Sequence, residues 1–203
     1  MRGFRSRPSA TKRGTAKLSE ARSVTSRKNA VFWGIVVVWV ATDIVTKAWA
    51  QSRLIPERLP RNVFGEFVRF TLVHNQGAAF GMHIGGASRW VFTGLTLVAL
   101  AMLWRLFRET HPGDWARTLA LALVSAGALG NLFDRLRSSR GVIDFIDIGT
   151  TGWRFWTFNV ADIGVTCGAI LLGLVLWREE RMRHASQSTA PSPPSLHTGD
   201  AEG

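Results

Sequence analysis

The chain has 203 residues and a mass of 22.4 kDa, with 46% hydrophobic residues, nine Trp and a formal net charge of +11. Its mean hydropathy of +0.09 averages a long apolar core with two polar ends: residues 1–29 hold nine of the 25 Lys and Arg residues, and residues 185–203 are rich in Ser, Pro and Thr. The apolar core argues against a soluble globular protein, and the single cysteine excludes a disulfide framework and a zinc site built on cysteines.

Four stretches approach the roughly 20 apolar residues that are needed to cross the hydrocarbon core of a membrane. The first contains Asp43 and Lys47 as its only charged residues, and the fourth contains only Asp162. We therefore predict an all-α membrane protein, a bundle of four transmembrane helices. A small extracytoplasmic subdomain, made of short β-strands or an amphipathic helix, is expected in residues 51–87. The predicted spans are about 30–50, 88–106, 115–135 and 155–177.

Basic residues beside the spans predict which ends of the chain are cytoplasmic. The head, residues 1–29, and the start of the tail, residues 179–203, are both basic, and four spans put both ends on the same side. We expect both to be disordered cytoplasmic segments that flank a core of residues 30–178. The outer connections are then 51–89 and 134–154, which also carry nine Arg, so the charge bias is incomplete.

The strong positive charge raises the alternative of nucleic-acid binding. Phe4 is the only aromatic residue of the basic head, and the head contains no recognisable nucleic-acid motif. We interpret the head as a cytoplasmic segment near anionic lipids and expect no nucleic-acid partner.

Polar residues collect at the outer ends of the predicted spans. Spans one and three end outside, and span four begins there, so residues that are distant in sequence share one membrane face. The residues in question are Asp43, Lys47, Asn75, Asn131, Asp134, Arg135, Asn159 and Asp162. Asp43 and Lys47 are four residues apart on one helix face, which is compatible with an internal ion pair and with substrate contact. Because charged groups in a membrane are costly, this one-sided cluster indicates a functional site.

The residue types at this face favour chemistry by carboxylates. His74 and His83 lack a metal-binding spacing, no serine lies in a nucleophile motif, and Cys167 has no base near it. Two aspartates that share one proton can hydrolyse a peptide bond, because the ionised partner activates water and the protonated partner protonates the carbonyl.

Asp162 has two candidate partners for such a pair. Residues 141–147 alternate apolar and acidic residues, so we expect an extended segment with Asp144 and Asp147 on opposite sides. Asp134 lies at the outer end of the third span. The residues alone leave Asp134 and Asp144 both open as the partner of Asp162.

Five motifs occur in order between residues 30 and 178. They are Asp43 with Lys47, Asn75-x-Gly77-Ala78-Ala79-Phe80-Gly81, Gly130-Asn131-x-x-Asp134-Arg135, Gly141-Val142-x-Asp144-Phe145, and Phe158-Asn159-x-Ala161-Asp162. Each motif is weak alone, but five in sequence on a protein with four spans are specific. The chain thereby resembles the lipoprotein signal peptidase family (signal peptidase II), bacterial aspartyl proteases of the membrane.

The resemblance implies that Asp144 and Asp162 are the catalytic dyad. It implies supporting or substrate-binding roles for Asn75, Gly77, Asn131, Asp134, Arg135, Asn159, Asp43 and Lys47. The implied reaction removes signal peptides from lipid-modified prolipoproteins by cutting before the diacylglyceryl-cysteine, at the extracytoplasmic face of the bacterial cytoplasmic membrane. The implied partners are the prolipoprotein substrate and membrane lipids. No cofactor or metal is implied, and we expect a monomer.

Two other functions compete with this hypothesis. A proton- or cation-coupled transporter would need polar residues along the whole path, including the inner halves of the spans, where they are almost absent. A membrane scaffold that uses acidic residues as helix contacts would not need the loop 75–81 or two separate aspartate motifs on one face.

Overall fold

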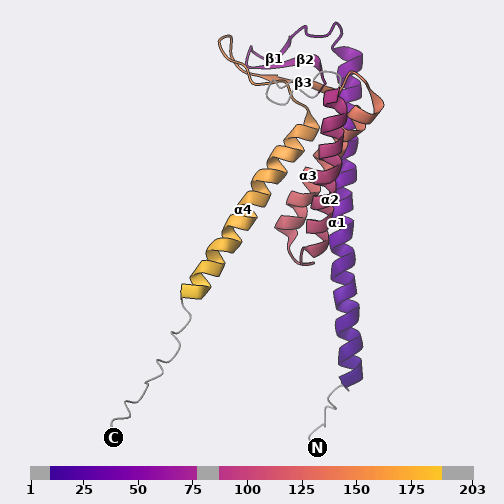
Figure 1. The fold of residues 1–203 in the computed structure, drawn as a ribbon, viewed down its shortest axis with the longest axis vertical. Coiled ribbons are helices and arrows are strands. Elements are labelled where there is room, and N and C mark those ends of the chain that lie inside the picture. Colours follow the sequence, from indigo (N-terminus) through magenta and orange to yellow (C-terminus); the bar gives the residue numbers. More distant parts are fainter. Residues whose placement is uncertain (1–9, 77–86, 189–203) are drawn as a thin grey trace, which may run out of the picture.

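The structure, a computed structural model, describes residues 10–76 and 87–188. Gly77 and the rest of the predicted loop motif after Gln76 lie outside the described residues. The elements follow one another as α1 (Ala10–Arg53), β1 (Arg61–Phe64), β2 (Val68–Asn75), α2 (Ser88–Glu109), α3 (Trp115–Arg137), β3 (Val142–Ile148) and α4 (Val160–Ser188) (Figure 1).

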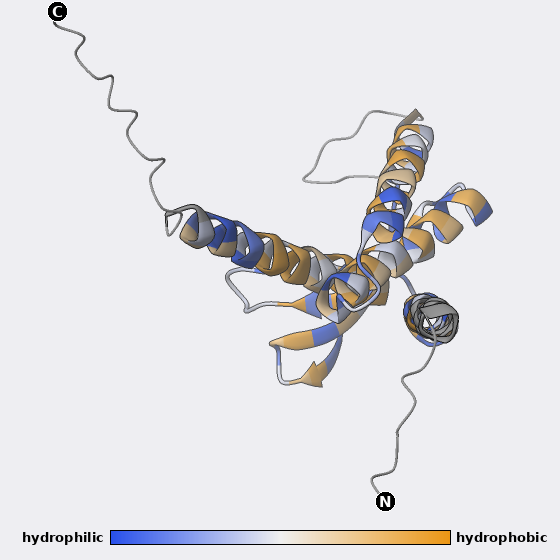
Figure 2. Ribbon diagram, turned by 90° about the horizontal axis from the view of Figure 1, so that it is seen from below, coloured by the Kyte–Doolittle hydropathy of each residue, from blue (hydrophilic) through white to orange (hydrophobic). Residues whose placement is uncertain are grey.

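All four helices are long and apolar enough to cross a membrane, α1 through its part Arg22–Arg53 and α4 through Val160–Ser186. Much of their apolar surface faces outward: Val37, Leu95 and Ile170 are each about 60% exposed. Figure 2 shows that apolar residues make up long parts of the helices. Such exposure is unfavourable in water and favourable in hydrocarbon, so the pattern is typical of a multi-pass membrane protein.

Helix α3 is the central helix, because it contacts each of the other three. Helix α4 diverges from α1 and α2 toward its C-terminal end (Figure 1). A cluster of buried apolar side chains joins α1, α2 and α3. Its members are Phe32, Val36, Leu103, Phe107, Leu121, Ala122 and Ala126.

A three-stranded antiparallel sheet in the order β1-β2-β3 lies at one end of the helices (Figure 1). The expected strands between the first two helices are present, but the sheet also includes β3, which follows α3. The sequence prediction of an all-α protein with a subdomain in residues 51–87 alone was therefore too simple. A second apolar cluster packs the sheet onto the end of α1, and it consists of Ala50, Leu54, Leu72, Ile143 and Phe145.

The helices extend into both ends that we predicted to be disordered. Helix α1 begins at Ala10, and no Pro or Gly occurs between residues 15 and 33 to interrupt it. Lys28, which the sequence placed in the head, is buried: its Nζ donates hydrogen bonds to the carbonyls of Phe107 (3.1 Å) and Thr110 (2.9 Å) at the end of α2. Helix α4 likewise continues to Ser188.

Helix α4 begins at Val160, five residues after the predicted start of the fourth span. The preceding residues are extended because they pair with β3. Phe155 donates its backbone N–H to the Ile148 carbonyl (2.8 Å), and Phe158 exchanges two backbone hydrogen bonds with Ile146 (2.8 and 3.0 Å). This pairing fixes the start of α4 against the middle of β3.

Candidate active site

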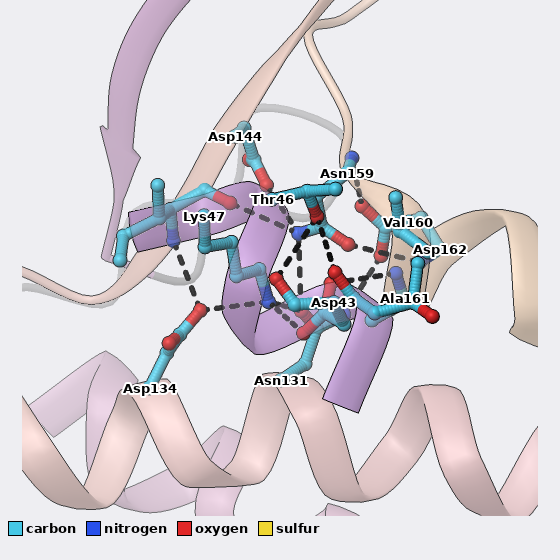
Figure 3. A network of polar contacts seen from close by, with 12 residues as sticks. Asp43, Thr46, Lys47, Asn131, Asp134, Asp144, Asn159, Val160, Ala161 and Asp162 are labelled. Carbon is cyan, nitrogen blue, oxygen red and sulfur yellow. Dashed lines mark hydrogen bonds and ion pairs between the residues drawn. The ribbon is translucent and has the colours of Figure 1, made fainter. Parts of the chain in front are cut away.

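The predicted site residues meet where β3 and the start of α4 lie against α1 and α3 (Figure 3). Asp144 occupies the middle of β3, paired in register with Val73 of β2. The side chain of Asn75, the last residue of β2, donates a hydrogen bond from Nδ2 to Asp144 Oδ2 (3.2 Å). The expected extended conformation of residues 141–147 is confirmed, and Asp144 and Asp147 contact different partners, as opposite faces of a strand require.

Asn159 and Asp162 form a reciprocal cap at the N-terminus of α4. The Asn159 side chain accepts a hydrogen bond from the Asp162 backbone N–H (3.0 Å), and the Asp162 carboxylate accepts one from the Asn159 backbone N–H (3.1 Å). These two bonds satisfy backbone donors that would otherwise lack a partner at a helix start. The cap fixes the Asp162 carboxyl at the first turn of α4.

The same Asn159 also binds Asp144. Its Nδ2 amide lies 2.7 Å from Asp144 Oδ1, 3.1 Å from Asn131 Oδ1 and 3.2 Å from the Ile143 carbonyl. Asn131 on α3 in turn donates from Nδ2 to Asp162 Oδ1 (2.8 Å). Two asparagines thus hold the two carboxyl groups in one network, although Asp144 comes from a strand and Asp162 from a helix (Figure 3).

Lys47 lies beside this network, and its ammonium group has an acceptor for each of its three hydrogens. Its Nζ is 2.7 Å from Asp43 Oδ2, 2.8 Å from Asp134 Oδ2 and 3.1 Å from Asn131 Oδ1. The side chain is 2% exposed. Of the two interpretations of the Asp43–Lys47 spacing, the internal ion pair is present, and it includes Asp134 as a second carboxylate (Figure 3).

Both carboxylates bound by Lys47 also accept backbone hydrogen bonds from the elements that carry the other two aspartates. Asp43 Oδ1 accepts from the Ala161 N–H of α4 (2.9 Å), and Asp134 Oδ2 accepts from the Ile143 N–H of β3 (3.2 Å). Lys47, Asp43 and Asp134 therefore connect α1, α3, β3 and α4. Asp134, left open by the sequence as a partner of Asp162, belongs to this ion-pair cluster.

The environment of Asp144 differs from that of Asp162. Asp144 is 3% exposed, whereas Asp162 is half-buried. Burial, together with the nearby charge of Asp162, raises the pKa of Asp144 to about 7, against the opposing effect of the hydrogen bonds from Asn75 and Asn159 and of the charge of Lys47. At neutral pH a large fraction of Asp144 is therefore protonated.

Two predicted residues, Arg135 and Gly77, remain to be placed relative to this network. Arg135, on α3, lies with its guanidinium 5.8 Å from the centroid of the Phe92 ring and interacts electrostatically with Asp162 and Asp144. Gly77 lies outside the described residues. Within residues 10–76 and 87–188, no group of three His, Cys, Asp or Glu residues is arranged to hold a metal ion.

One part of the site was not predicted from the sequence. A cleft of about 620 Å³ opens on Asp144, and four ionisable residues of β2 and of the connections that precede β1 and β3 line it, namely Glu57, Arg58, His74 and Arg140. Three of them, Glu57, Arg58 and Arg140, lie in connecting segments without periodic patterns, and the sequence carries no signal that brings them together. For His74, the sequence raised only a role as a metal ligand, which the absence of a metal-binding spacing argues against.

Comparison with known proteins decides the family. A family model described as "Signal peptidase (SPase) II" matches residues 35–178. The chain belongs to the signal peptidase II family. The resemblance that the five motifs indicated is thus confirmed, and the match covers the region in which they occur.

Curated relatives support the signal peptidase II assignment over most of the chain. The lipoprotein signal peptidase of Hydrogenovibrio crunogenus is 36% identical over 168 residues, which cover 78% of this chain and 92% of the relative. That of Rhodococcus jostii is 40% identical over 152 residues, which cover 73% of each chain.

Two solved structures, each described as a bacterial membrane enzyme, share the fold of this signal peptidase II. One has a TM-score of 0.64 at 32% identity and covers 72% of this chain and 92% of its own. The other has a TM-score of 0.67 at 29% identity and covers 81% of this chain and 94% of its own.

The protein is accordingly a multi-pass membrane protease of the aspartic type that removes signal peptides from lipoproteins. The alternative of a coupled transporter receives no support from these comparisons.

Proposed function

We propose that Asp144 and Asp162 are the catalytic dyad that cuts a prolipoprotein before its diacylglyceryl-cysteine. The observation that carries this proposal is the shared contact with Asn159. Its side-chain amide donates to Asp144 Oδ1 (2.7 Å), and its backbone N–H donates to Asp162 Oδ2 (3.1 Å). A single residue thus holds both carboxyl groups, as a dyad that acts on one water molecule requires.

The different environments of the two aspartates support separate roles for them. Asp144, with a pKa of about 7, is the acid that donates its proton to the scissile carbonyl oxygen. Asp162, at the N-terminus of α4, accepts two hydrogen bonds and carries the negative charge that a helix start favours. Asp162 takes a proton from water, and the resulting hydroxide adds to the carbonyl carbon. The C–N bond then breaks, the leaving amine receives the proton from Asp162, and Asp144 regains its own proton from the hydroxyl group as the new acid forms.

The remaining predicted residues position the dyad or the substrate. Asn131 and Asn159 orient the carboxyl groups, and Asp43, Lys47 and Asp134 fix the elements that carry them. Asn75, with Gly77 after it, and Arg135 are the proposed substrate contacts.

We further propose that both termini are cytoplasmic and that the site faces outward. The sheet and the proposed dyad lie at the end of the helices where the connections 51–89 and 134–154 lie, opposite the N-terminal end of α1, which carries basic residues (Figure 1). In this arrangement the peptidase core is residues 30–178, a helix bundle with an extracytoplasmic sheet, and it acts as a monomer in contact with membrane lipids. A substrate anchored by its lipid and its apolar signal peptide is already confined to the plane of the site, which lowers the entropic cost of encounter.

Substitution of each aspartate tests the dyad. In an assay with a purified lipidated precursor, Asp144→Asn and Asp162→Asn should each lower kcat/KM by roughly a thousandfold or more, because general acid and base catalysis are lost. Both variants should still accumulate in the membrane, since Asn preserves the size of the side chain.

Asp114→Asn is the matched control. Asp114 caps α3 at the opposite end of the molecule by accepting a hydrogen bond from the Arg117 N–H (3.0 Å), and Asn serves equally well as a cap. Its activity should match that of the unsubstituted enzyme. Cleavage by both dyad variants at the rate of this control would eliminate the proposed mechanism.

A further inference from the structure

The cleft that opens on Asp144 lies entirely outside the membrane-spanning helices. Its wall is formed by residues of the α1–β1 connection, the end of β2, the α3–β3 connection with β3, and the segment before α4. The lining residues are Glu57, Arg58, Val73, His74, Asn75, Gln76, Arg140, Asp144, Trp156 and Thr157. Asn131 on α3 and Lys47 on α1, which belong to membrane-spanning helices, do not line it. The cleft is therefore on the aqueous side of the proposed dyad.

This position matches one part of the substrate, provided that the proposed function holds. The signal peptide and the lipid chains on the cysteine are apolar and remain in the membrane. The polypeptide that follows the cysteine is the mature lipoprotein, which continues into water. Its first residues must pass the dyad on the aqueous side, where the cleft offers polar and charged side chains.

The charges that face the cleft do not cancel. Arg140 donates a hydrogen bond to Glu57 and forms an ion pair with it, so these two charges compensate each other. His74 is 8% exposed, 3.4 Å from Glu57, and burial together with the charge of Arg140 lowers its pKa, so it is mostly neutral at pH 7. Arg58 has no carboxylate partner among the described residues. Apart from Asp144, the wall has one uncompensated positive charge.

The backbone holds Arg58 in place at the rim of the cleft. Its φ is +61°, in the left-handed region that residues other than glycine rarely adopt, and its N–H donates a hydrogen bond to the Leu72 carbonyl of β2 (3.0 Å). Arg58 is thus attached through its backbone to the sheet that carries Asp144, although it belongs to the α1–β1 connection. We propose that this cleft binds the first residues after the lipid-modified cysteine and that Arg58 makes it favour acidic side chains there.

The test compares two lipidated precursors that differ only at the residue after the cysteine, Glu in one and Lys in the other. The unsubstituted enzyme should cleave the Glu precursor with a kcat/KM roughly threefold to fivefold higher, as expected for one partly exposed ion pair. The ratio should fall to about 1 in Arg58→Gln and invert in Arg58→Glu. The change should lie mainly in KM, because binding is altered and the dyad is not.

Arg61→Glu is the matched control, because Arg61 lies three residues away, is exposed, and does not line the cleft. An equal ratio in the unsubstituted enzyme and in Arg58→Glu would overturn the proposal, and so would an equal shift in Arg61→Glu, which would indicate only the overall field of the protein. Asp144→Asn separates this result from the dyad proposal. Cleavage of both precursors by that variant would remove the proposed mechanism, while the Arg58 ratios would still decide the subsite.

Discussion

Lys47 and Asp144 of the proposed dyad illustrate how buried charges are accommodated at this site. A buried ammonium is costly unless each of its hydrogens has an acceptor, and Lys47 has three within 3.1 Å. Asp144 is relieved differently, by binding a proton at a pH where an exposed carboxyl would be ionised. Asp144 can therefore keep its proton near neutral pH within the network that it shares with Asp162.

The pKa of Asp144 predicts a basic limb in the pH profile. As pH rises through about 7, the proposed acid loses its proton, so kcat/KM should fall by roughly tenfold for each further pH unit. Steady-state assays on a lipidated precursor between about pH 6 and pH 9 would measure it.

Stability provides an independent readout of the same proton. Because the pKa of Asp144 is raised on folding, its contribution to stability is fully present below the unfolded value near 3.8 and is lost as pH rises through about 7. The Tm of the unsubstituted enzyme should therefore fall over this range relative to that of Asp144→Asn. Parallel Tm profiles and a flat activity profile would contradict the assignment of Asp144 as the acid.

At the scale of the elements, the site depends on the close approach of α3 to α1 and α4. A Cβ added at Gly130 of α3 would lie 2.5 Å from Asp43 Oδ2 and 3.2 Å from the Ala161 Cβ. Glycine at this position leaves space for the Asp43 carboxylate, which binds Lys47 of α1 and the N-terminus of α4. The small residue therefore matters for the polar network as well as for helix packing.

Gly130→Ala should destabilise the protein by about 1–3 kcal/mol, because the added methyl displaces Asp43. A lower Tm in detergent, with reduced cleavage, would show this. Gly173→Ala in α4 is the control: apart from the adjacent α4 backbone, nothing lies within 4 Å of its added Cβ, so its Tm should be unchanged or slightly higher. A Gly130→Ala protein as stable as this control would refute the packing argument.

At the scale of the whole molecule, the sheet lies at one end of the helices (Figure 1), and the proposed dyad and the cleft are formed by this sheet and the segments next to it. Large aromatic residues around this end are exposed: Phe64 and Phe67 at the β1–β2 turn, and Trp153 and Trp156 before α4, are between 53% and 77% accessible. Aromatic side chains of this kind favour the boundary between membrane and water. Their position supports a site at the membrane surface.

The proposed orientation can be tested by labelling. In a Cys167→Ser background, a cysteine in place of Leu59 should react with a membrane-impermeant maleimide in intact cells, whereas one in place of His184 should react only after lysis. Both side chains are exposed, at 50% for residue 59 and 73% for residue 184, so access to the reagent depends only on the side of the membrane. The reverse labelling pattern would invert the proposed topology.

The amino-acid sequence by itself determined the four apolar helices, because hydrocarbon imposes length and hydropathy locally on each segment. It also determined the family, through five motifs, and the grouping of polar residues at one face. It could not determine the third strand of the sheet, because alternation in residues 141–147 does not name a partner strand.

Only the tertiary structure decided how the polar residues divide into sets. It joined Asp134 to Asp43 and Lys47, joined Asp144 to Asp162 through Asn131 and Asn159, and placed Arg58 at a cleft beside them. Each of these contacts spans elements that are distant along the chain. Their geometry follows from how α3, β3 and α4 pack together, and local sequence preferences do not encode that packing.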